Sequence, residues 1–224
     1  MLVKNRMTPD PVAVAADAPL STALRLMREH RVRHLPVVEG GELVGMLSDR
    51  DLRLAMPSPL GMESPEDVAA AEGTPVAEVM SRGAITAGPY DTLEDSAVRM
   101  RRHRVGSLPV VDAAGGLVGI LTETDIIQAF VEIFTSSGPS SRLEMSMPDR
   151  PGELSRAMRA IGEELNINVN SVMVTGRDGN GRKTAVVSLA TIDPREAIAA
   201  LERIGVEVGW PSLENDVRRL GGGL

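Results

Sequence analysis

The stretch that decides the fold is residues 26–52, LMREHRVRHLPVVEGGELVGMLSDRDL, because it occurs again as residues 99–126, RMRRHRVGSLPVVDAAGGLVGILTETDI. The segment LPVV at Leu35 matches LPVV at Leu108, with an offset of 73. One extra residue in the second glycine turn changes the offset to 74, so that Asp51 matches Asp125. Agreement at so many positions identifies an internal repeat, and repeated units of this kind are expected to pack together.

Each copy reads as one supersecondary unit. Leu20, Leu24 and Met27 recur at the spacing of an amphipathic helix. A proline, Pro36 or Pro109, then begins a short strand. A glycine turn, a second strand and a second helix follow. The sequence therefore predicts two β-α-β-β-α repeats of mixed α/β class.

The composition limits the class of protein. The chain has 224 residues, enough for about two domains. It is 42% hydrophobic but only 2% aromatic, and its net charge is −7. We therefore expect an aliphatic core and no general affinity for nucleic acids or anionic membranes. The absence of cysteine excludes disulfides and thiol nucleophiles. No segment has the length and apolarity of a signal peptide or a membrane span, so we expect a soluble cytoplasmic protein.

Both repeats carry a glycine, a hydroxyl residue and an aspartate at fixed spacing before the second helix: Ser48 and Asp51 in the first, Thr122 and Asp125 in the second. One interpretation is a capping box, in which hydroxyl and carboxylate satisfy the helix N-terminus. The other is a ribose-phosphate site. The hydroxyl and the helix N-terminus would bind a phosphate, and the aspartate would accept hydrogen bonds from two sugar hydroxyls. The same groups can cap the helix when the site is empty.

With these loops and the LPVV segments, residues 1–135 resemble a pair of cystathionine-β-synthase (CBS) motifs. The resemblance implies two clefts that bind adenosine derivatives, with AMP expected first and ATP, ADP, NAD or S-adenosylmethionine as alternatives. It implies that Asp51 and Asp125 bind ribose hydroxyls, and that Ser48 and Thr122 contact phosphate. The residues that would flank the adenine are Val14, Thr86, His34 and Ser107, partly through their backbones.

Two basic clusters support a phosphate ligand. Residues 25–34 carry a local net charge of +3 and residues 99–104 a net charge of +4, and Arg31 and Arg104 match each other. In a chain of net charge −7, these clusters favour an anion-binding surface, although basic residues also stabilise helix C-termini. An acidic residue inside each loop favours a monophosphate over longer phosphate chains.

Catalytic groups are not expected. His30 and His34 have the spacing of a helical metal pair, but Pro36 ends the helix there and no third ligand is in view. The chain has no Cys and no plausible Ser/His/Asp arrangement, so we expect neither a metal site nor an enzyme.

The pattern changes after residue 140. Leu143, Met145 and Met147 alternate as in a half-buried strand. Two helices and three further strands follow, in the order βαββαβ of a ferredoxin-like, α+β domain.

The turn DRPGEL, residues 149–154, makes this segment similar to an ACT domain, a module that commonly binds amino acids. The resemblance implies that Asp149 and Gly152 face an effector, together with Asn168 and Asn170. A tight turn that caps a helix is the alternative explanation of the same residues.

Nearly the whole chain resembles the acetoin-utilisation protein B family. The resemblance implies a cytoplasmic, regulatory homodimer related to acetoin or carbon metabolism. A dimeric adaptor without ligand remains an alternative, as does an enzyme of acetoin breakdown. The expected boundaries are repeat one at 1–55, a linker at 56–74, repeat two at 75–135, a linker at 136–140, the ACT domain at 141–214 and a tail at 215–224.

Overall fold

A computed structural model describes residues 1–55, 71–134, 138–177 and 181–211. Most of the predicted linker at 56–74 and all of the predicted tail at 215–224 lie outside these residues. The chain divides into two compact units, Met1–Ala129 and Phe130–Leu224. The division falls within a helix, α6 (Glu123–Phe134).

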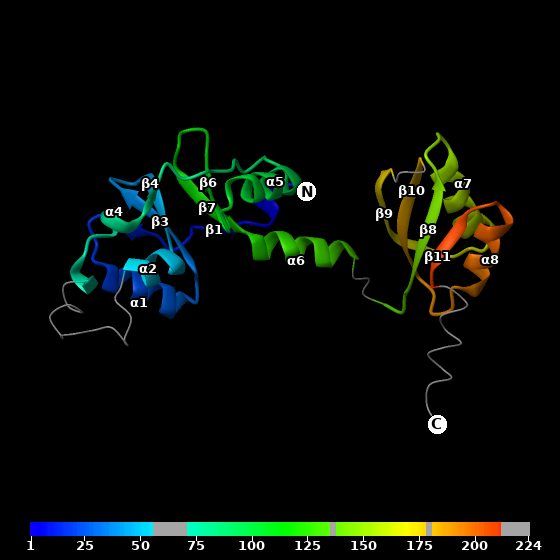
Figure 1. Ribbon diagram of the computed structural model, residues 1–224, viewed down its shortest axis with the longest axis horizontal. Helices are drawn as coiled ribbons and strands as arrows, with labels where there is room; N and C mark the ends of the chain where they lie inside the picture. Colours follow the sequence, from blue (N-terminus) through cyan, green and yellow to red (C-terminus); the bar gives the residue numbers. More distant parts are fainter. Residues whose placement is uncertain (56–70, 135–137, 178–180, 212–224) are drawn as a thin grey trace, which may run out of the picture. The chain divides into compact units, whose positions relative to one another are not determined.

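The first repeat has the predicted order β-α-β-β-α. A proline at position 19 precedes α1, and Arg31 ends this helix in the left-handed conformation, with φ of 55°. The sheet order is β2-β3-β4-β5, in which β3 and β4 form an antiparallel hairpin (Figure 1). The elements are β2 (Val14–Ala15), α1 (Leu20–His30), β3 (His34–Glu39), β4 (Glu42–Ser48), α2 (Asp49–Ala55) and the later strand β5 (Ser81–Arg82).

The second repeat has the same plan, and its sheet includes a strand from the start of the chain. The sheet order is β1-β7-β6, and Ala87 forms the parallel bridge to Val110 that corresponds to β2 in the first repeat. The elements are β1 (Thr8–Pro9), α5 (Leu93–His103), β6 (Ser107–Val111), β7 (Leu117–Thr122) and α6. The helix α4 (Val76–Val79) instead packs in the core of the first repeat, through the buried Val76. Each repeat has its own aliphatic core, one around Leu35 and Leu47, the other around Leu108 and Leu121.

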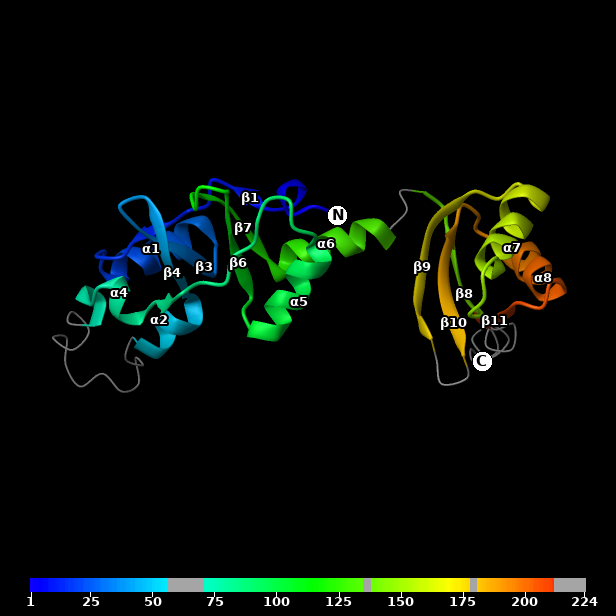
Figure 2. The ribbon, with the colours of Figure 1, turned by 90° about the horizontal axis from the view of Figure 1, so that it is seen from above.

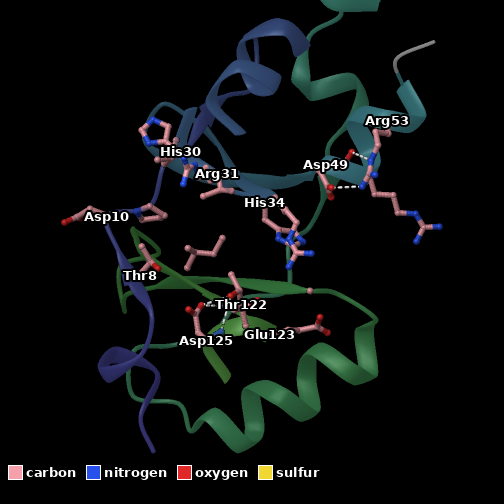
Figure 3. Close-up of a pocket in the computed structure, with 18 residues that line it drawn as sticks. Thr8, Asp10, His30, Arg31, His34, Asp49, Arg53, Thr122, Glu123 and Asp125 are labelled. Carbon is pink, nitrogen blue, oxygen red and sulfur yellow. Dashed lines mark hydrogen bonds and ion pairs between the residues drawn. The ribbon is translucent and has the colours of Figure 1, made fainter. Parts of the chain in front are cut away.

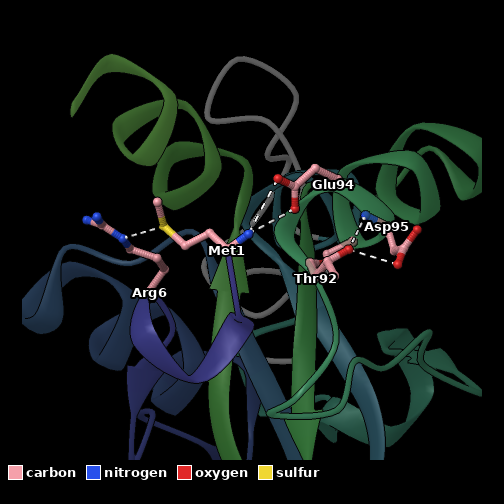
Figure 4. A network of polar contacts seen from close by, with 6 residues as sticks. Met1, Arg6, Thr92, Glu94 and Asp95 are labelled. Atoms are coloured by element: carbon pink, nitrogen blue, oxygen red, sulfur yellow. Dashed lines mark hydrogen bonds and ion pairs between the residues drawn. The ribbon is translucent and has the colours of Figure 1, made fainter. Parts of the chain in front are cut away.

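The N-terminal segment belongs structurally to the second repeat. Val3, in the short helix η1 (Val3–Asn5), is fully buried in the core of that repeat. Its amide donates to the Asp91 carbonyl at 2.9 Å, and the Leu93 amide donates to the Met1 carbonyl at 2.9 Å. Figure 4 shows the Met1 amino group beside the Glu94 carboxylate at the start of α5. The first residues of the chain therefore complete a domain whose other elements come after residue 75.

The C-terminal unit has the predicted order βαββαβ. Its antiparallel sheet has the order β11-β8-β10-β9, and the helices α7 and α8 lie on one side of that sheet (Figure 2). Between the sheet and the helices lies a core that includes Leu143, Met145, Val187 and Leu201. The elements are β8 (Ser141–Pro148), α7 (Glu153–Arg159), η2 (Ala160–Glu164), β9 (Val169–Arg177), β10 (Arg182–Leu189), α8 (Arg195–Arg203) and β11 (Glu207–Trp210). In the parts of the chain that the structure covers, no helix is both long and apolar enough to span a membrane.

Candidate functional site

The two hydroxyl-aspartate loops form matching capping boxes. Asp51 Oδ2 accepts hydrogen bonds from the Ser48 amide at 2.9 Å and the Ser48 hydroxyl at 2.6 Å, and the Asp51 amide donates to Ser48 Oγ at 3.2 Å. Asp125 and Thr122 form the same three bonds at 2.7, 2.7 and 3.3 Å. The capping interpretation of the sequence is thus confirmed for both loops, at the first turns of α2 and α6.

The cap leaves each aspartate one carboxylate oxygen for another partner. Asp125 accepts both bonds from Thr122 on Oδ2, and among the described residues no hydrogen bond ends on Oδ1. The side chain is half-buried at the start of α6. Capping therefore orients this carboxylate and keeps it compatible with a ligand that donates hydrogen bonds.

A cavity of about 960 Å³ lies beside the second loop, and it is built by both repeats. Figure 3 shows His34 on the first-repeat side of the cavity, with Thr122 and Asp125 on the second-repeat side. The residues that line it are Thr8, Asp10, Pro11, Val12, His30, Arg31, Val32, Arg33, His34, Asp49, Arg50, Arg53, Gly106, Ile120, Thr122, Glu123, Thr124 and Asp125.

The cavity brings some of the predicted binding residues together and leaves others apart. Thr122, Asp125, His34 and Arg31 all line it. The other candidates, which do not line this cavity, are Ser48, Asp51, Val14, Thr86, Ser107 and Arg104.

Two of those candidates have side chains directed into the protein. Val14 is a member of the first core and is 3% exposed, and Ser107 is 5% exposed. In the first repeat it is Val12, two residues earlier, that reaches the cavity. A role for Val14 or Ser107 in ligand binding would have to be carried by the backbone.

His34 occupies a half-buried position at the centre of the cavity. A Cβ added to Gly106 would lie 3.3 Å from both Cε1 and Nε2 of the His34 ring, so the glycine makes room for the imidazole. Burial lowers the pKa of His34 below its ordinary value, and the adjacent Arg33 lowers it further. The carboxylates of Asp49, Glu123 and Asp51 oppose this shift. His34 is therefore mainly neutral near pH 7 and can both donate and accept hydrogen bonds.

Several arginines give the cavity a capacity for anions. Arg53 pairs with Asp49 at 2.6 Å. Among the residues that the structure describes, Arg31, Arg33 and Arg50 have no ion-pair partner, and all three line the cavity. A phosphate beside Thr122 would meet these guanidinium groups together with the N-terminus of the twelve-residue helix α6.

Sequence reasoning missed Thr8, Asp10, Arg50 and Arg53. Thr8 matches Ser81 at the same offset of 73 that relates the repeats, so extending the comparison to the start of the chain would have included it. Arg50 lies between Ser48 and Asp51, but a motif defined by the hydroxyl and the aspartate does not include it.

The glycines of the two loops, Gly119 and Gly45, lie against the neighbouring edge strands. A Cβ at Gly119 would lie 2.5 Å from Met7 Sδ and 3.1 Å from the Thr8 carbonyl oxygen. A Cβ at Gly45 would lie 2.8 Å from both Met80 Sδ and a neighbouring backbone oxygen. These glycines therefore leave room for the segments that contain the edge strands β1 and β5.

In the C-terminal unit, the four predicted effector residues do not converge within one copy. Asp149 forms an ion pair with Lys183 at 2.9 Å, and Gly152 lies at the start of α7 with φ of 89°. Asn168 lies at the opposite end of the sheet, where its carbonyl accepts a hydrogen bond from the Ala190 amide, and Asn170 lies beyond it on β9. The tight, helix-initiating turn at Asp149 and Gly152 is present, and the effector site remains a prediction.

Comparisons with known proteins assign the N-terminal part of the chain. The CBS domain family model matches residues 3–58 and 76–132. A CBS domain-containing protein of Dictyostelium discoideum is 32% identical over 143 residues, which cover 63% of this chain and 99% of that protein.

Solved structures give the same result. A candidate acetoin utilization protein (AcuB) from Vibrio cholerae matches with a TM-score of 0.50 and 32% identity, over 60% of this chain and 93% of that one. The CBS domain pair of protein MJ0100, in complex with 5′-methylthioadenosine and S-adenosyl-L-methionine, matches with a TM-score of 0.50 and 27% identity, over 59% of this chain and 97% of that one.

Proposed function

Because the chain belongs to the CBS domain family, with both of its CBS domains in the N-terminal unit, we propose that it is a regulatory protein that senses an adenosine-containing nucleotide. The observation that carries the proposal is the cavity between the two CBS domains. It combines the Thr122–Asp125 loop with the cationic and heteroaromatic side chains Arg31 and His34 of the other domain.

The chemistry of the cavity matches the parts of a nucleotide. Asp125 Oδ1 can accept hydrogen bonds from ribose hydroxyls while Oδ2 keeps the helix cap. The Thr122 hydroxyl can turn from Asp125 Oδ2, which keeps its bond from the Thr122 amide, and donate to a phosphate instead. The nearby arginines and the N-terminus of α6 would balance the charge of that phosphate. The volume of about 960 Å³ lies within the range of ligand pockets. Asp49 and Glu123 disfavour a long phosphate chain, so AMP is the first candidate, with ADP, ATP, NAD and S-adenosylmethionine as the alternatives.

The relatives support the adenosine part of this proposal. Both ligands of the MJ0100 domain pair contain adenosine and neither contains phosphate. An adenosine moiety is thus the common element, and the arginines of this chain are the reason to add a phosphate.

We further propose that the protein is not an enzyme, and that it acts as a cytoplasmic homodimer whose C-terminal unit is an ACT domain. The βαββαβ order and the Asp149-to-Gly152 turn support the ACT assignment. The similarity to the AcuB protein supports a link to acetoin or carbon metabolism. The proposed boundaries remain those expected from the sequence.

Thermal unfolding of the full chain with AMP, ADP, ATP, NAD and S-adenosylmethionine tests the sensing function. A ligand at 100 times its Kd stabilises the folded state by about 2.7 kcal/mol. UMP serves as a control with the same ribose and phosphate but a different base. A midpoint that none of the adenosine compounds raises would contradict the proposal.

Such a result would favour the adaptor alternative, which the self-contained caps in both loops also permit. A homodimer that binds no nucleotide would be its signature. Addition of amino acids to the same unfolding assay tests the ACT domain separately.

A further inference from the structure

The two CBS domains place equivalent residues around two clefts, so the clefts can be compared position by position. The edge strand of each cleft pairs with the sheet that ends in the hydroxyl-aspartate loop. Thr8 pairs with Ile120 beside the Thr122–Asp125 loop, and the matching Ser81 pairs with Met46 beside the Ser48–Asp51 loop. We infer that the chain binds one nucleotide, in the cleft of Thr122 and Asp125, and that the cleft of Ser48 and Asp51 stays without one. This inference rests on the proposed function and adds the site and the stoichiometry.

The first difference between the clefts is at the position before the LPVV strand. In the Asp125 cleft this residue is His34, whose half-buried ring lines the cavity. In the Asp51 cleft it is Ser107, which is 5% exposed and presents almost no surface to a ligand. An imidazole offers a flat face for a purine and a polar edge for a phosphate, and the buried serine offers neither.

The second difference is at the fifth residue of each helix that follows a hydroxyl-aspartate loop. Arg53 on α2 lines the Asp125 cavity. Its equivalent on α6 is Ile127, an apolar side chain that is 62% exposed. An anion in the Asp51 cleft would therefore lack a cation that an anion in the Asp125 cleft has.

The third difference is in the backbone segment before the first long helix of each repeat, at Ala13 and Thr86. The carbonyl of Thr86 accepts a hydrogen bond from Arg99 Nη1 at 2.5 Å, and the same guanidinium pairs with Asp91 at 3.1 Å. In the first repeat, Ala13 matches Thr86 and Leu26 matches Arg99. Leucine has no donor, so no side chain at that position engages the Ala13 carbonyl, and the neighbouring Val12 lines the Asp125 cavity. The segment at Thr86 is already engaged by its own domain.

The two clefts share arginines, and this sharing is the reason to expect that only one nucleotide binds. Arg33 and Arg50 line the Asp125 cavity together with their own repeat equivalents, Gly106 and Thr124. When a residue and its equivalent in the other repeat line the same cavity, both lie where the two clefts adjoin. A second phosphate would therefore compete with the first for Arg33 and Arg50 and be repelled by it.

Isothermal titration of the full chain with AMP tests this inference, using two matched variants. Asparagine at position 125 or 51 keeps an amide oxygen that can accept the capping bonds, and a thermal melt of each variant verifies that it is folded. We expect one AMP per chain, a loss of affinity of tenfold or more in Asp125→Asn, and an affinity within about twofold of the unmodified protein in Asp51→Asn.

Two AMP molecules per chain, or equal losses in the two variants, would overturn the inference and leave the proposed function standing. A chain that binds no adenosine compound would overturn both. The two failures are therefore distinguishable in one set of titrations.

Discussion

Replacement of Gly119 by alanine tests how closely the N-terminal segment packs against the second CBS domain. The added Cβ would lie 2.5 Å from Met7 Sδ, 3.1 Å from Met7 Cγ and 3.1 Å from the Thr8 carbonyl oxygen. The methionine side chain can rotate away. The carbonyl cannot move freely, because Thr8 pairs with Ile120 in the β1–β7 ladder. Overpacking of this kind costs about 1–3 kcal/mol.

In a unit of this size, 1 kcal/mol corresponds to about 4 °C in Tm, so the expected fall in Tm is about 4–12 °C. Scanning calorimetry of the full chain measures it. Gly73→Ala is the control in the same unit, because a Cβ at Gly73 meets nothing within 4 Å.

A double variant, Gly119→Ala with Met7→Ala, separates the side-chain contacts from the backbone contact. Since the two shortest distances that involve a side chain are both to Met7, we expect the double variant to lose less stability than the two single variants together. A Gly119→Ala protein that melts within about 1 °C of the unmodified chain, or strictly additive losses, would refute the close packing.

Three further predictions concern titration and capping. Burial lowers the pKa of His34 from its ordinary value of 6.5; the unfolded chain therefore binds more protons near pH 6, and stability falls as the pH drops through that value. His34→Gln should flatten this slope in urea unfolding between pH 5.5 and 7.5, and an unchanged slope would assign it to another group. Asp125→Ala removes the partner of the Thr122 amide and should cost about 1 kcal/mol in urea unfolding without ligand; no loss would mean that the cap contributes nothing. Thr92 Oγ1 accepts a hydrogen bond from the Asp95 amide at 3.0 Å, so Thr92→Ala should also cost about 1 kcal/mol while Thr92→Ser retains most of it; equal losses in both variants would show that the hydroxyl is not the cause.

Much of the fold follows from periodicity in the sequence. The helical spacing of Leu20, Leu24 and Met27, and the strand alternation of Leu143 and Met145, appear in the structure as α1 and β8. These patterns are local, and each records which side of one element faces a core.

The residues that line the cavity could not be predicted from periodicity in the same way. Strand β1 contains only Thr8 and Pro9, too few residues for any periodicity, and its partner Ile120 lies far along the chain. The repeat alignment also treats His34 and Ser107 as equivalent, although one is half-buried in a cavity and the other is enclosed. Equivalent positions of the two repeats occupy the same place in the backbone fold. The exposure of the side chain at each position depends on the side chains around it.

The candidate effector residues show the same limit in the C-terminal unit. The turn at Asp149 and Gly152 is a local motif, but the ion pair from Asp149 to Lys183 joins this turn to strand β10. No local pattern contains such a pairing, because sheet register is set by the whole domain.

The burial of Val3 in the second CBS domain has a consequence for folding during synthesis. Val3 and Thr8 are synthesised long before their partners in the second domain, because Thr8 must wait for Ile120 to emerge from the ribosome. The first CBS domain can form its core earlier, while Val3 is still without the core in which it is buried. Contacts between such distant residues slow folding, so we expect a refolding phase in which the second domain closes only after the N-terminal segment docks.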